Sequence, residues 1–238
     1  MADLEKPIIK IEDLSFTYPD GRNALKNIDL SIMTGEKIGI IGSNGAGKST
    51  LIFHLNGIFS GNGAIHINEM LINKENLKKI RSIVGIVLQD PDDQLFSPTV
   101  LDDVAYGPIY QGIKQELVVE RVEAALAAVQ MQGFEKRAPF HLSVGEKKRI
   151  AIASVLAMQP EILVLDEPSA GLDPKARREL IELLSTFPQT LIVASHDLDL
   201  VKKLTKRTII LSSGKITAAG ITDDILSNQE ILAKNGLV

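Results

Sequence analysis

Apolar residues along this chain fall into two kinds of short run, which predict two kinds of strand. Near-alternate apolar positions in 8–33, interrupted by a turn beginning at Tyr18, predict two strands with one buried face. Residues 64–72 have the pattern of a further hairpin. Continuous apolar runs are typical of strands buried on both faces, as in a parallel sheet. Such runs are 37–41, 83–88, 162–165 and 190–194, and two more short strands are expected at 207–211 and 215–217.

The region between residues 90 and 160 has helical rather than strand periodicity. Apolar residues share one helix face over 117–131, and 100–105 and 143–158 are also expected to be helical, the last with Ser143 as N-cap. A later helix is expected from Pro174 to about Thr186, with Asp173 as its cap, before two short C-terminal helices. We therefore predict one α/β domain over 1–238, with a core made of 1–89 and 161–238 and a helical subdomain at 90–160.

The apolar run 37–41 leads into the sequence Gly42-Ser43-Asn44-Gly45-Ala46-Gly47-Lys48-Ser49-Thr50 and then into an apolar helix. This stretch fits the P-loop pattern G-x-x-x-x-G-K-[ST] in the strand, loop and helix order that the motif needs. Glycines permit positive φ, and the loop N–H groups can then surround phosphate oxygens. Lys48 supplies charge for the β- and γ-phosphates, and the Ser49 hydroxyl can bind Mg²⁺. The alternative, a plain glycine turn, explains less of the pattern.

Polar residues follow three other buried runs, and ligands gather outside the carboxyl ends of parallel strands. We expect Gln89 to reach Mg²⁺ or an attacking water, Asp166 to bind Mg²⁺, and Glu167 to orient or deprotonate the water. His196 can hydrogen-bond a γ-phosphate oxygen, and Tyr18 can stack on adenine. The alternatives at these positions are a surface amide, strand-end acids in water, a structural histidine, and a ring packed on its own turn.

Composition limits the partners. A net charge of −4 gives no general attraction to nucleic acid. The chain has no cysteine, which excludes disulfides and thiolate metal sites and fits a reducing cytoplasm. No apolar run approaches the ~20 residues that cross a bilayer, and the N-terminus has no signal-peptide pattern. Membrane association is therefore expected to go through a protein partner. The basic run Lys147-Lys148-Arg149 is by itself typical of a solvated helix face.

In this order the motifs resemble those of the ATP-binding subunits of ABC transporters. The matching positions are Tyr18, the P-loop, Gln89, the signature at Leu142-Ser143-Val144-Gly145-Glu146, the Walker B strand Ile162 to Asp166, Glu167, the D-loop Ser169 to Asp173, and His196. The resemblance implies a P-loop NTPase core, a parallel sheet flanked by helices, with an N-terminal antiparallel β subdomain and an inserted helical subdomain. It also implies that the signature, usually written LSGGQ, contacts ATP held by a second subunit. Val144 and Glu146 depart from that pattern, while Ser143 and Gly145 keep it.

The stretches Leu88 to Phe96 and Asp103 to Pro108 resemble the energy-coupling-factor importers, in particular the ATPase subunits of cobalt or nickel uptake systems. This resemblance implies a peripheral ATPase at the cytoplasmic face of the cell membrane, dimerising around two Mg-ATP, with a homodimer favoured. It implies a transmembrane T component, contacted by Asp90 to Tyr106, and a separate cargo-selecting membrane protein. The alternatives are the ATPase of a vitamin importer or of another ABC transporter, and a soluble ABC-type ATPase acting on DNA. The net acidity and the lack of coiled-coil heptads argue against the last.

Overall fold

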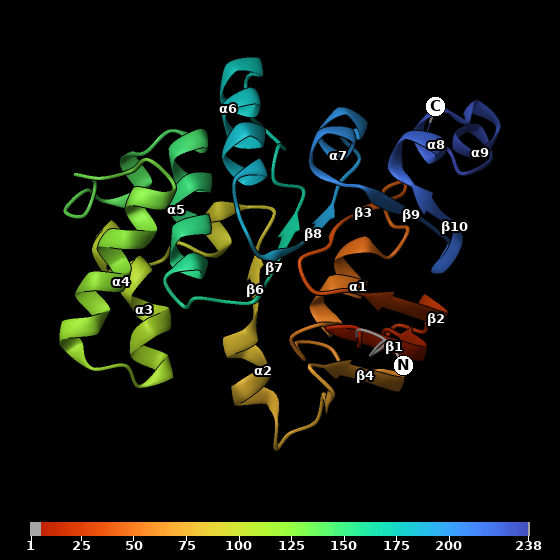
Figure 1. Cartoon of the computed structure of the whole chain (residues 1–238), viewed down its shortest axis with the longest axis horizontal. Coiled ribbons are helices and arrows are strands. Elements are labelled where there is room, and N and C mark those ends of the chain that lie inside the picture. Colours follow the sequence, from red (N-terminus) through yellow and green to blue (C-terminus); the bar gives the residue numbers. More distant parts are fainter. Residues whose placement is uncertain (1–5, 238) are drawn as a thin grey trace, which may run out of the picture.

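Two β-sheets of different type form the framework of the computed structural model, which describes residues 6–237 (Figure 1). The smaller sheet is antiparallel and has the strand order β2-β1-β4-β5. Its strands are β1 (Ile9–Thr17), β2 (Asn23–Ile32), β4 (Asn62–Ile67) and β5 (Met70–Leu71). Both predicted hairpins are therefore confirmed. The first five residues, part of the stretch without a signal-peptide pattern, lie outside the described residues.

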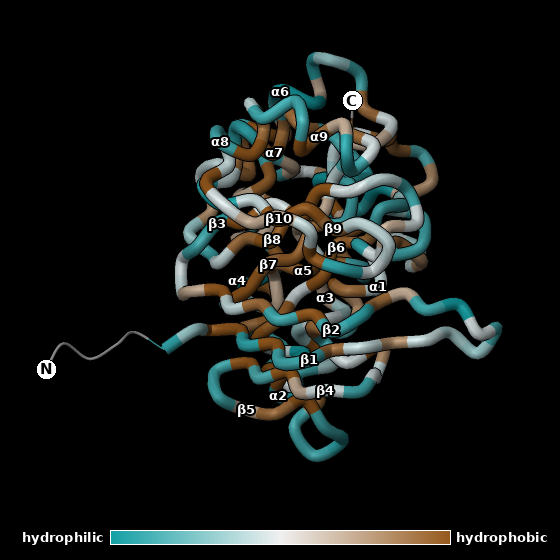
Figure 2. Tube along the Cα trace, turned by 90° about the vertical axis from the view of Figure 1, so that its right-hand side faces the viewer, coloured by the Kyte–Doolittle hydropathy of each residue, from teal (hydrophilic) through white to brown (hydrophobic). Residues whose placement is uncertain are grey.

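The larger sheet has the order β10-β9-β3-β8-β7-β6, and every pair in it except β10 with β9 is parallel. Its strands are β3 (Lys37–Ile41), β6 (Val84–Val87), β7 (Ile162–Asp166), β8 (Thr190–Ala194), β9 (Arg207–Ser212) and β10 (Lys215–Ile221). All residues of β7 and β8 are buried, which explains their continuous apolar sequences. Figure 2 shows hydrophobic residues along the inner strands and hydrophilic residues on the outer turns.

Helices cover both faces of the larger sheet. Helix α1 (Lys48–His54) lies between the two sheets, and its Leu51 and Ile52 join the core that the sheets share. The opposite face packs against a second core. The helices on that side are α6 (Pro174–Ser185), α7 (Leu198–Leu204), α8 (Thr222–Ser227) and α9 (Gln229–Lys234). Asp173 caps α6 as predicted, by accepting from the N–H groups of Lys175 and Ala176.

Three helices pack together at the β6 side of the sheet (Figure 1). They are α3 (Val100–Gln111), α4 (Gln115–Ala128) and α5 (Val144–Leu156), with short 3₁₀ turns at Pro91–Asp93 and Pro139–His141. The predicted apolar face of α4 is buried. Helix α3 runs past Pro108, further than predicted. Gly107 allows it to approach the segment that follows α5, because a Cβ there would lie 2.5 Å from Met158 Cγ.

Two helices were not predicted from the sequence: α2 (Leu77–Ile83) and α7. Each has only seven residues and leads into or follows a buried strand, so its periodicity is too short to stand out. Within residues 6–237, none of the helices combines the length and the apolar character that a membrane span requires.

Candidate nucleotide-binding site

Strand order brings the predicted site residues together. Strands β3, β8, β7 and β6 are neighbours, so the segments that follow them emerge along one edge of the sheet. A cavity of about 450 Å³ lies at this edge. It is lined by Tyr18, Arg22, Asn23, Ala24, Asn44, Gly45, Gly47, Lys48, Ser49, Thr50, Gln89, Glu167 and His196. Sequence analysis missed Arg22, Asn23 and Ala24, because only a turn signal marks that segment.

Two glycines of the loop are required by close approach of other backbone atoms. A Cβ on Gly42 would lie 2.3 Å from the carbonyl oxygen of Leu211. Gly47 has φ +109, and a Cβ there would lie 2.7 Å from the carbonyl oxygen of Ala24. The loop is therefore held against β2 and β9 in a conformation that side chains would prevent. Gly42, Ser43 and Ala46 belong to the loop but do not line the cavity.

Lys48 and Glu167 form a buried charged pair at the base of the cavity. Lys48 Nζ donates to the carbonyl oxygen of Gly42 at 2.8 Å and lies 3.4 Å from Glu167 Oε1. Glu167 Oε2 accepts from Ser195 Oγ at 2.9 Å and from the backbone N–H of His196 at 3.2 Å. The Nδ1 of His196 lies 2.8 Å from the same oxygen. One carboxylate oxygen is thus fixed by the β8 end, while the other faces the lysine.

The backbone of Glu167 is also unusual, since its φ of +43 lies in the left-handed region that glycine normally occupies. The Glu167 N–H donates to the carbonyl oxygen of Ala194 at 2.8 Å and ties this turn to the end of β8. Such strained positions cost about 1–3 kcal/mol and cluster at functional sites. Glu167 lines the nucleotide cavity, whereas Asp166, one residue earlier, lines a neighbouring cavity.

Asp166 and Ser49 supply oxygens that fit a hard cation. Asp166 is 3% exposed, and its Oδ1 has no hydrogen-bond partner within the described residues. Burial raises the pKa of Asp166, while a hydrogen bond from the Ser49 hydroxyl acts in the opposite direction. An orphaned buried carboxylate oxygen beside a hydroxyl suits Mg²⁺, which prefers oxygen ligands. Ser49, Gln89 and Asp166, the three predicted Mg²⁺ residues, all line one adjoining cavity.

Tyr18 stands at the outer wall of the site. Its hydroxyl hydrogen-bonds Thr50 Oγ1 at 2.8 Å, which links the end of β1 to the first turn of α1. The Arg22 guanidinium carbon lies 4.7 Å from the centre of the Tyr18 ring. Rings of Phe16 and Phe59 meet Tyr18 edge on. The ring is therefore held at the cavity wall with Arg22 over one face, and stacking on adenine stays a prediction.

The signature residues do not line the nucleotide cavity, although Val144 lines the adjoining cavity that contains Asp166. Ser143 caps α5, and its Oγ accepts from the N–H of Glu146 at 3.3 Å. In return, the Glu146 carboxylate accepts from the N–H and from the hydroxyl of Ser143, each at 2.8 Å. These hydrogen bonds lower the pKa of Glu146. The sequence S-V-G-E is therefore a capping box, in which glutamate works as well as the family's glutamine. Val144 is 48% exposed, and Leu142 is buried.

Comparison with known proteins agrees with this geometry. The sequence pattern of the ABC transporter family matches residues 25–170. The energy-coupling factor transporter ATP-binding protein EcfA of Methanothermobacter thermautotrophicus is 46% identical over 97% of this chain and 76% of its own length. EcfA of Carboxydothermus hydrogenoformans is also 46% identical, over 96% of this chain and 86% of its own length.

Solved structures give the same result. The structure of cbiO1 from Clostridium perfringens, part of the ABC transporter complex cbiONQ, has a TM-score of 0.85 and 37% identity, and covers 98% of this chain and 96% of that one. A dimeric, post-hydrolysis structure of the ATP-binding cassette MJ0796 with ADP and Pi has a TM-score of 0.80 and 28% identity, over 90% of this chain and 98% of that one. The chain therefore belongs to the ABC transporter family, as one of its ATP-binding, ATP-hydrolysing subunits.

Proposed function

We propose that this chain is the motor subunit of an energy-coupling-factor importer that moves cobalt or another transition-metal ion. The EcfA relatives and the likeness to cbiO1 support the importer class. The cargo is supported by the sequence resemblance of residues 88–108 to the ATPases of cobalt and nickel uptake systems. The described residues contain no group of three or more His, Cys, Asp and Glu side chains that could hold a metal ion. A vitamin importer or another ABC transporter is the alternative.

The position of Ser143 outside the nucleotide cavity is the observation that supports a dimer. Tyr18, Lys48 and Glu167 line that cavity, whereas Ser143 stands at the start of α5 outside it. We infer that Ser143 and Gly145 of one copy approach the ATP held by a second copy, so that two subunits enclose two Mg-ATP. A homodimer suffices, because this chain carries both halves of the site. The chain would act at the cytoplasmic face of the membrane, with residues 90–160 as a helical subdomain.

The chemistry assigned to the chain's own residues follows from the Glu167 contacts. Phosphate oxygens compete with Glu167 Oε1 for the Lys48 ammonium, so ATP binding releases Oε1 to take a proton from the attacking water. Ser195 and His196 keep Oε2 in place meanwhile. Asp166, Ser49 and Gln89 would hold Mg²⁺, which neutralises charge on the phosphates. Lys48 and the loop N–H groups position the phosphates.

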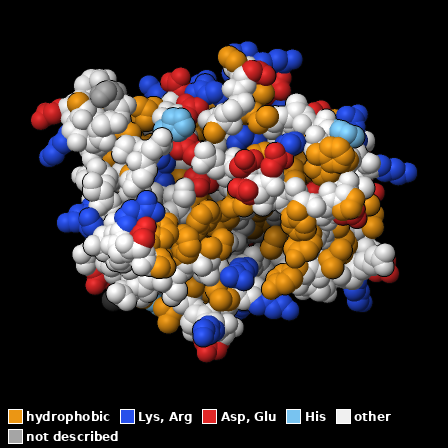
Figure 3. Space-filling view, turned by 180° about the vertical axis from the view of Figure 1, so that it is seen from behind, with side chains coloured by type: hydrophobic (Ala, Val, Ile, Leu, Met, Phe, Trp, Pro, Cys, Tyr) orange, Lys and Arg blue, Asp and Glu red, His pale blue; other side chains and the backbone are white. Residues whose placement is uncertain are grey.

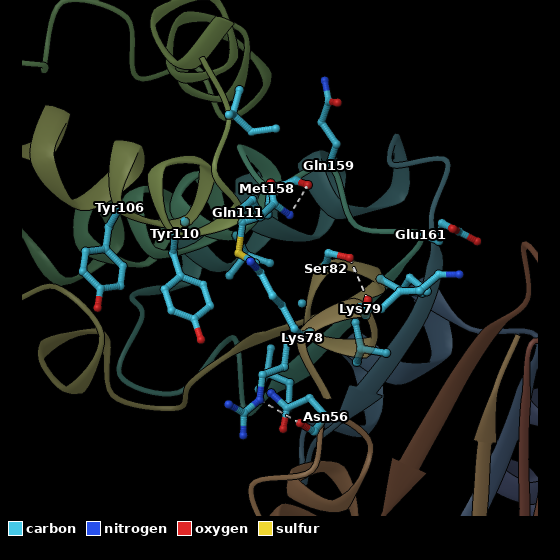
Figure 4. A pocket seen from close by; sticks show the side chains of 18 of the residues that line it. Asn56, Lys78, Lys79, Ser82, Tyr106, Tyr110, Gln111, Met158, Gln159 and Glu161 are labelled. Carbon is cyan, nitrogen blue, oxygen red and sulfur yellow. Dashed lines mark hydrogen bonds between the residues drawn. The ribbon is translucent and has the colours of Figure 1, made fainter. Parts of the chain in front are cut away.

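A groove of about 870 Å³ is the proposed docking surface for the transmembrane T component. It lies between α2, β6 and α3, and Figure 4 shows Tyr106 and Tyr110 projecting into it from α3, across from Lys78 and Asn56. Tyr106 is the end of the predicted contact stretch Asp90 to Tyr106, and the 68% exposed Phe96 packs edge on against its ring. Figure 3 shows a hollow on one face, with hydrophobic side chains on both sides of it, basic side chains below it and acidic side chains above it. A groove whose lining is mostly apolar suits a helical segment of a partner protein.

The variant Glu167→Gln tests the catalytic assignment and the dimer together. Loss of the general base is expected to lower ATP hydrolysis by about 10²–10⁴-fold. The same variant should accumulate as a dimer with saturating Mg-ATP, measured by light scattering after size exclusion. The exposed Glu230→Gln on α9 is the matched control and should behave as wild type. Only monomers with saturating Mg-ATP would count against the proposed dimer.

The cargo and the partners are tested by a pull-down of the tagged chain from its native membranes after mild solubilisation. Recovery of a T component with one dedicated metal-selecting protein supports the metal importer. Several cargo-selecting proteins, or a second ATPase, indicate a shared vitamin-type module instead. Tyr110→Ser should reduce recovery of the T component if the groove is the docking surface.

A further inference from the structure

The basic run at the start of α5 is not a solvated face, contrary to the interpretation from sequence. Lys148 is 5% exposed. Its Nζ donates to the carbonyl oxygen of Gln89 at 3.0 Å and to the carbonyl oxygen of Glu167 at 3.3 Å. A single ammonium group thus joins the helix that Ser143 caps, the loop after β6 and the end of β7.

Packing alone does not explain a charge at this position. Burial lowers the pKa of Lys148, and nearby Asp90, Glu167 and Asp166 act in the opposite direction. Within residues 6–237 the ammonium is held by backbone carbonyls rather than by a direct ion pair. Burying a charge costs free energy, and apolar side chains of similar volume often replace buried charges without loss of stability. The two carbonyl oxygens that Lys148 joins belong to Gln89 and Glu167, both assigned to the site.

We propose that Lys148 is a positioning residue that ties the backbone of the Gln89 loop to the backbone of Glu167, so that hydrolysis depends on where this loop lies. The inference rests on the proposed role of Glu167 as general base. Lys148 does not line the nucleotide cavity, but it lines the adjoining cavity of Ser49, Gln89 and Asp166. It acts through the strained turn at Glu167. Lys148 donates to the Glu167 carbonyl oxygen, while the Glu167 N–H donates to the carbonyl oxygen of Ala194.

Gln94 also attaches the loop after β6 to α5, so that a shift of this loop can reach Lys148. Gln94 Nε2 donates to the carbonyl oxygen of Ala151 at 2.8 Å and to Ser154 Oγ at 2.9 Å, both on α5. Gln94 Oε1 accepts from the N–H of Leu88 at 3.0 Å. The loop is therefore fixed on α5 at one end by Gln94 and at the other by Lys148. A displacement of the loop by a docked partner must break the Lys148 contacts or shift Glu167 with it.

The test compares two methionine substitutions on the same helix. Lys148→Met keeps the apolar stem and removes the charge and its donors. Lys147→Met is the control, because Lys147 pairs with Asp92 of the same loop at 2.6 Å but hydrogen-bonds neither carbonyl. Lys148→Gln retains two donors on a shorter side chain and serves as the conservative variant. For each full-length protein, kcat, the Kd for Mg-ATP with Mg²⁺ present, and the melting temperature are measured.

We expect Lys148→Met to lower kcat by about 10- to 100-fold, the scale of a small misplacement of a catalytic group. The Kd for Mg-ATP and the melting temperature should stay near those of wild type, and Lys148→Gln should recover part of kcat. Lys147→Met should keep the wild-type kcat. Wild-type kcat in Lys148→Met, with Glu167→Gln inactive, would overturn the inference. A parallel fall of kcat, affinity and melting temperature would do so too, because it indicates a purely structural role. An active Glu167→Gln would instead overturn the assignment of Glu167.

Discussion

Asp166→Asn should make the nucleotide-free protein more stable while it weakens Mg-ATP binding. Asp166 is buried, its Oδ1 is without a hydrogen-bond partner in the described residues, and burial raises its pKa. The carboxylate is therefore destabilising in the fold at neutral pH, although its charge is what a bound cation needs. An amide of the same shape removes the charge and keeps the packing. Stability and function are thus expected to change in opposite directions at this residue.

The size of the effect follows from the contacts. An unsatisfied buried polar group costs about 1–3 kcal/mol, and more when it is charged. The amide leaves part of that cost and weakens the hydrogen bond from Ser49, so the expected net gain is about 1 kcal/mol. For a chain of this length, about 1 kcal/mol raises the melting temperature by about 2–4 °C. Wild-type protein should gain about 2.7 kcal/mol from Mg-ATP at 100 times its Kd, and the variant should gain much less at the same concentration.

Urea titrations of both proteins, with and without Mg-ATP, measure these changes. The pH dependence gives a second readout. A carboxyl whose folded-state pKa is raised binds protons more readily in the folded chain, so wild-type stability recovers as the pH falls through that pKa. The advantage of Asp166→Asn should therefore shrink on acidification. The control is Asp223→Asn, whose side chain is 76% exposed. A nucleotide-free Asp166→Asn protein that is less stable than wild type at neutral pH would refute the reasoning.

Substitutions at three other residues give distinct outcomes. Gly47→Ala should abolish Mg-ATP binding in a fluorescent-nucleotide titration, because its Cβ would clash with the Ala24 carbonyl oxygen at a φ of +109. Tyr18→Ala should weaken that binding by about 1–3 kcal/mol if the ring stacks on the base, whereas Tyr18→Phe, which loses the Thr50 contact alone, should cost less. Asp197 is half-buried, and this desolvation favours a higher pKa, but hydrogen bonds led by Arg177 lower the pKa to about 2. The stability difference between wild type and Asp197→Asn in urea titrations should accordingly be full at pH 7 and disappear as the pH falls from 3.8 to about 2.

Local sequence was sufficient wherever one short segment carries the physical cause. The N-cap at Ser143 could be predicted, because the side chain and the N–H group it caps lie within one helical turn. The burial of Lys148 could not be predicted, since it depends on carbonyl oxygens that lie 59 and 19 residues away in the chain. The same holds for Gly107, whose role is visible only once α3 lies against Met158. The environments of Lys148 and Gly107 depend on contacts between distant segments, and the periodicity of the sequence does not predict such contacts.

The strand register explains why the site was largely predictable all the same. In the parallel part of the sheet, Ile40 pairs with Ala194, Leu165 with Val193, and Val87 with Leu165. The residues that follow these positions must therefore emerge at the same edge. In a parallel sheet, polar residues that follow buried strands are therefore neighbours in space, even when they are far apart in the sequence. The signature begins a helix instead of ending a strand, so no such rule gathers it into this cavity. In the proposed dimer, the second copy therefore supplies its own signature to the ATP that Lys48 of this chain binds.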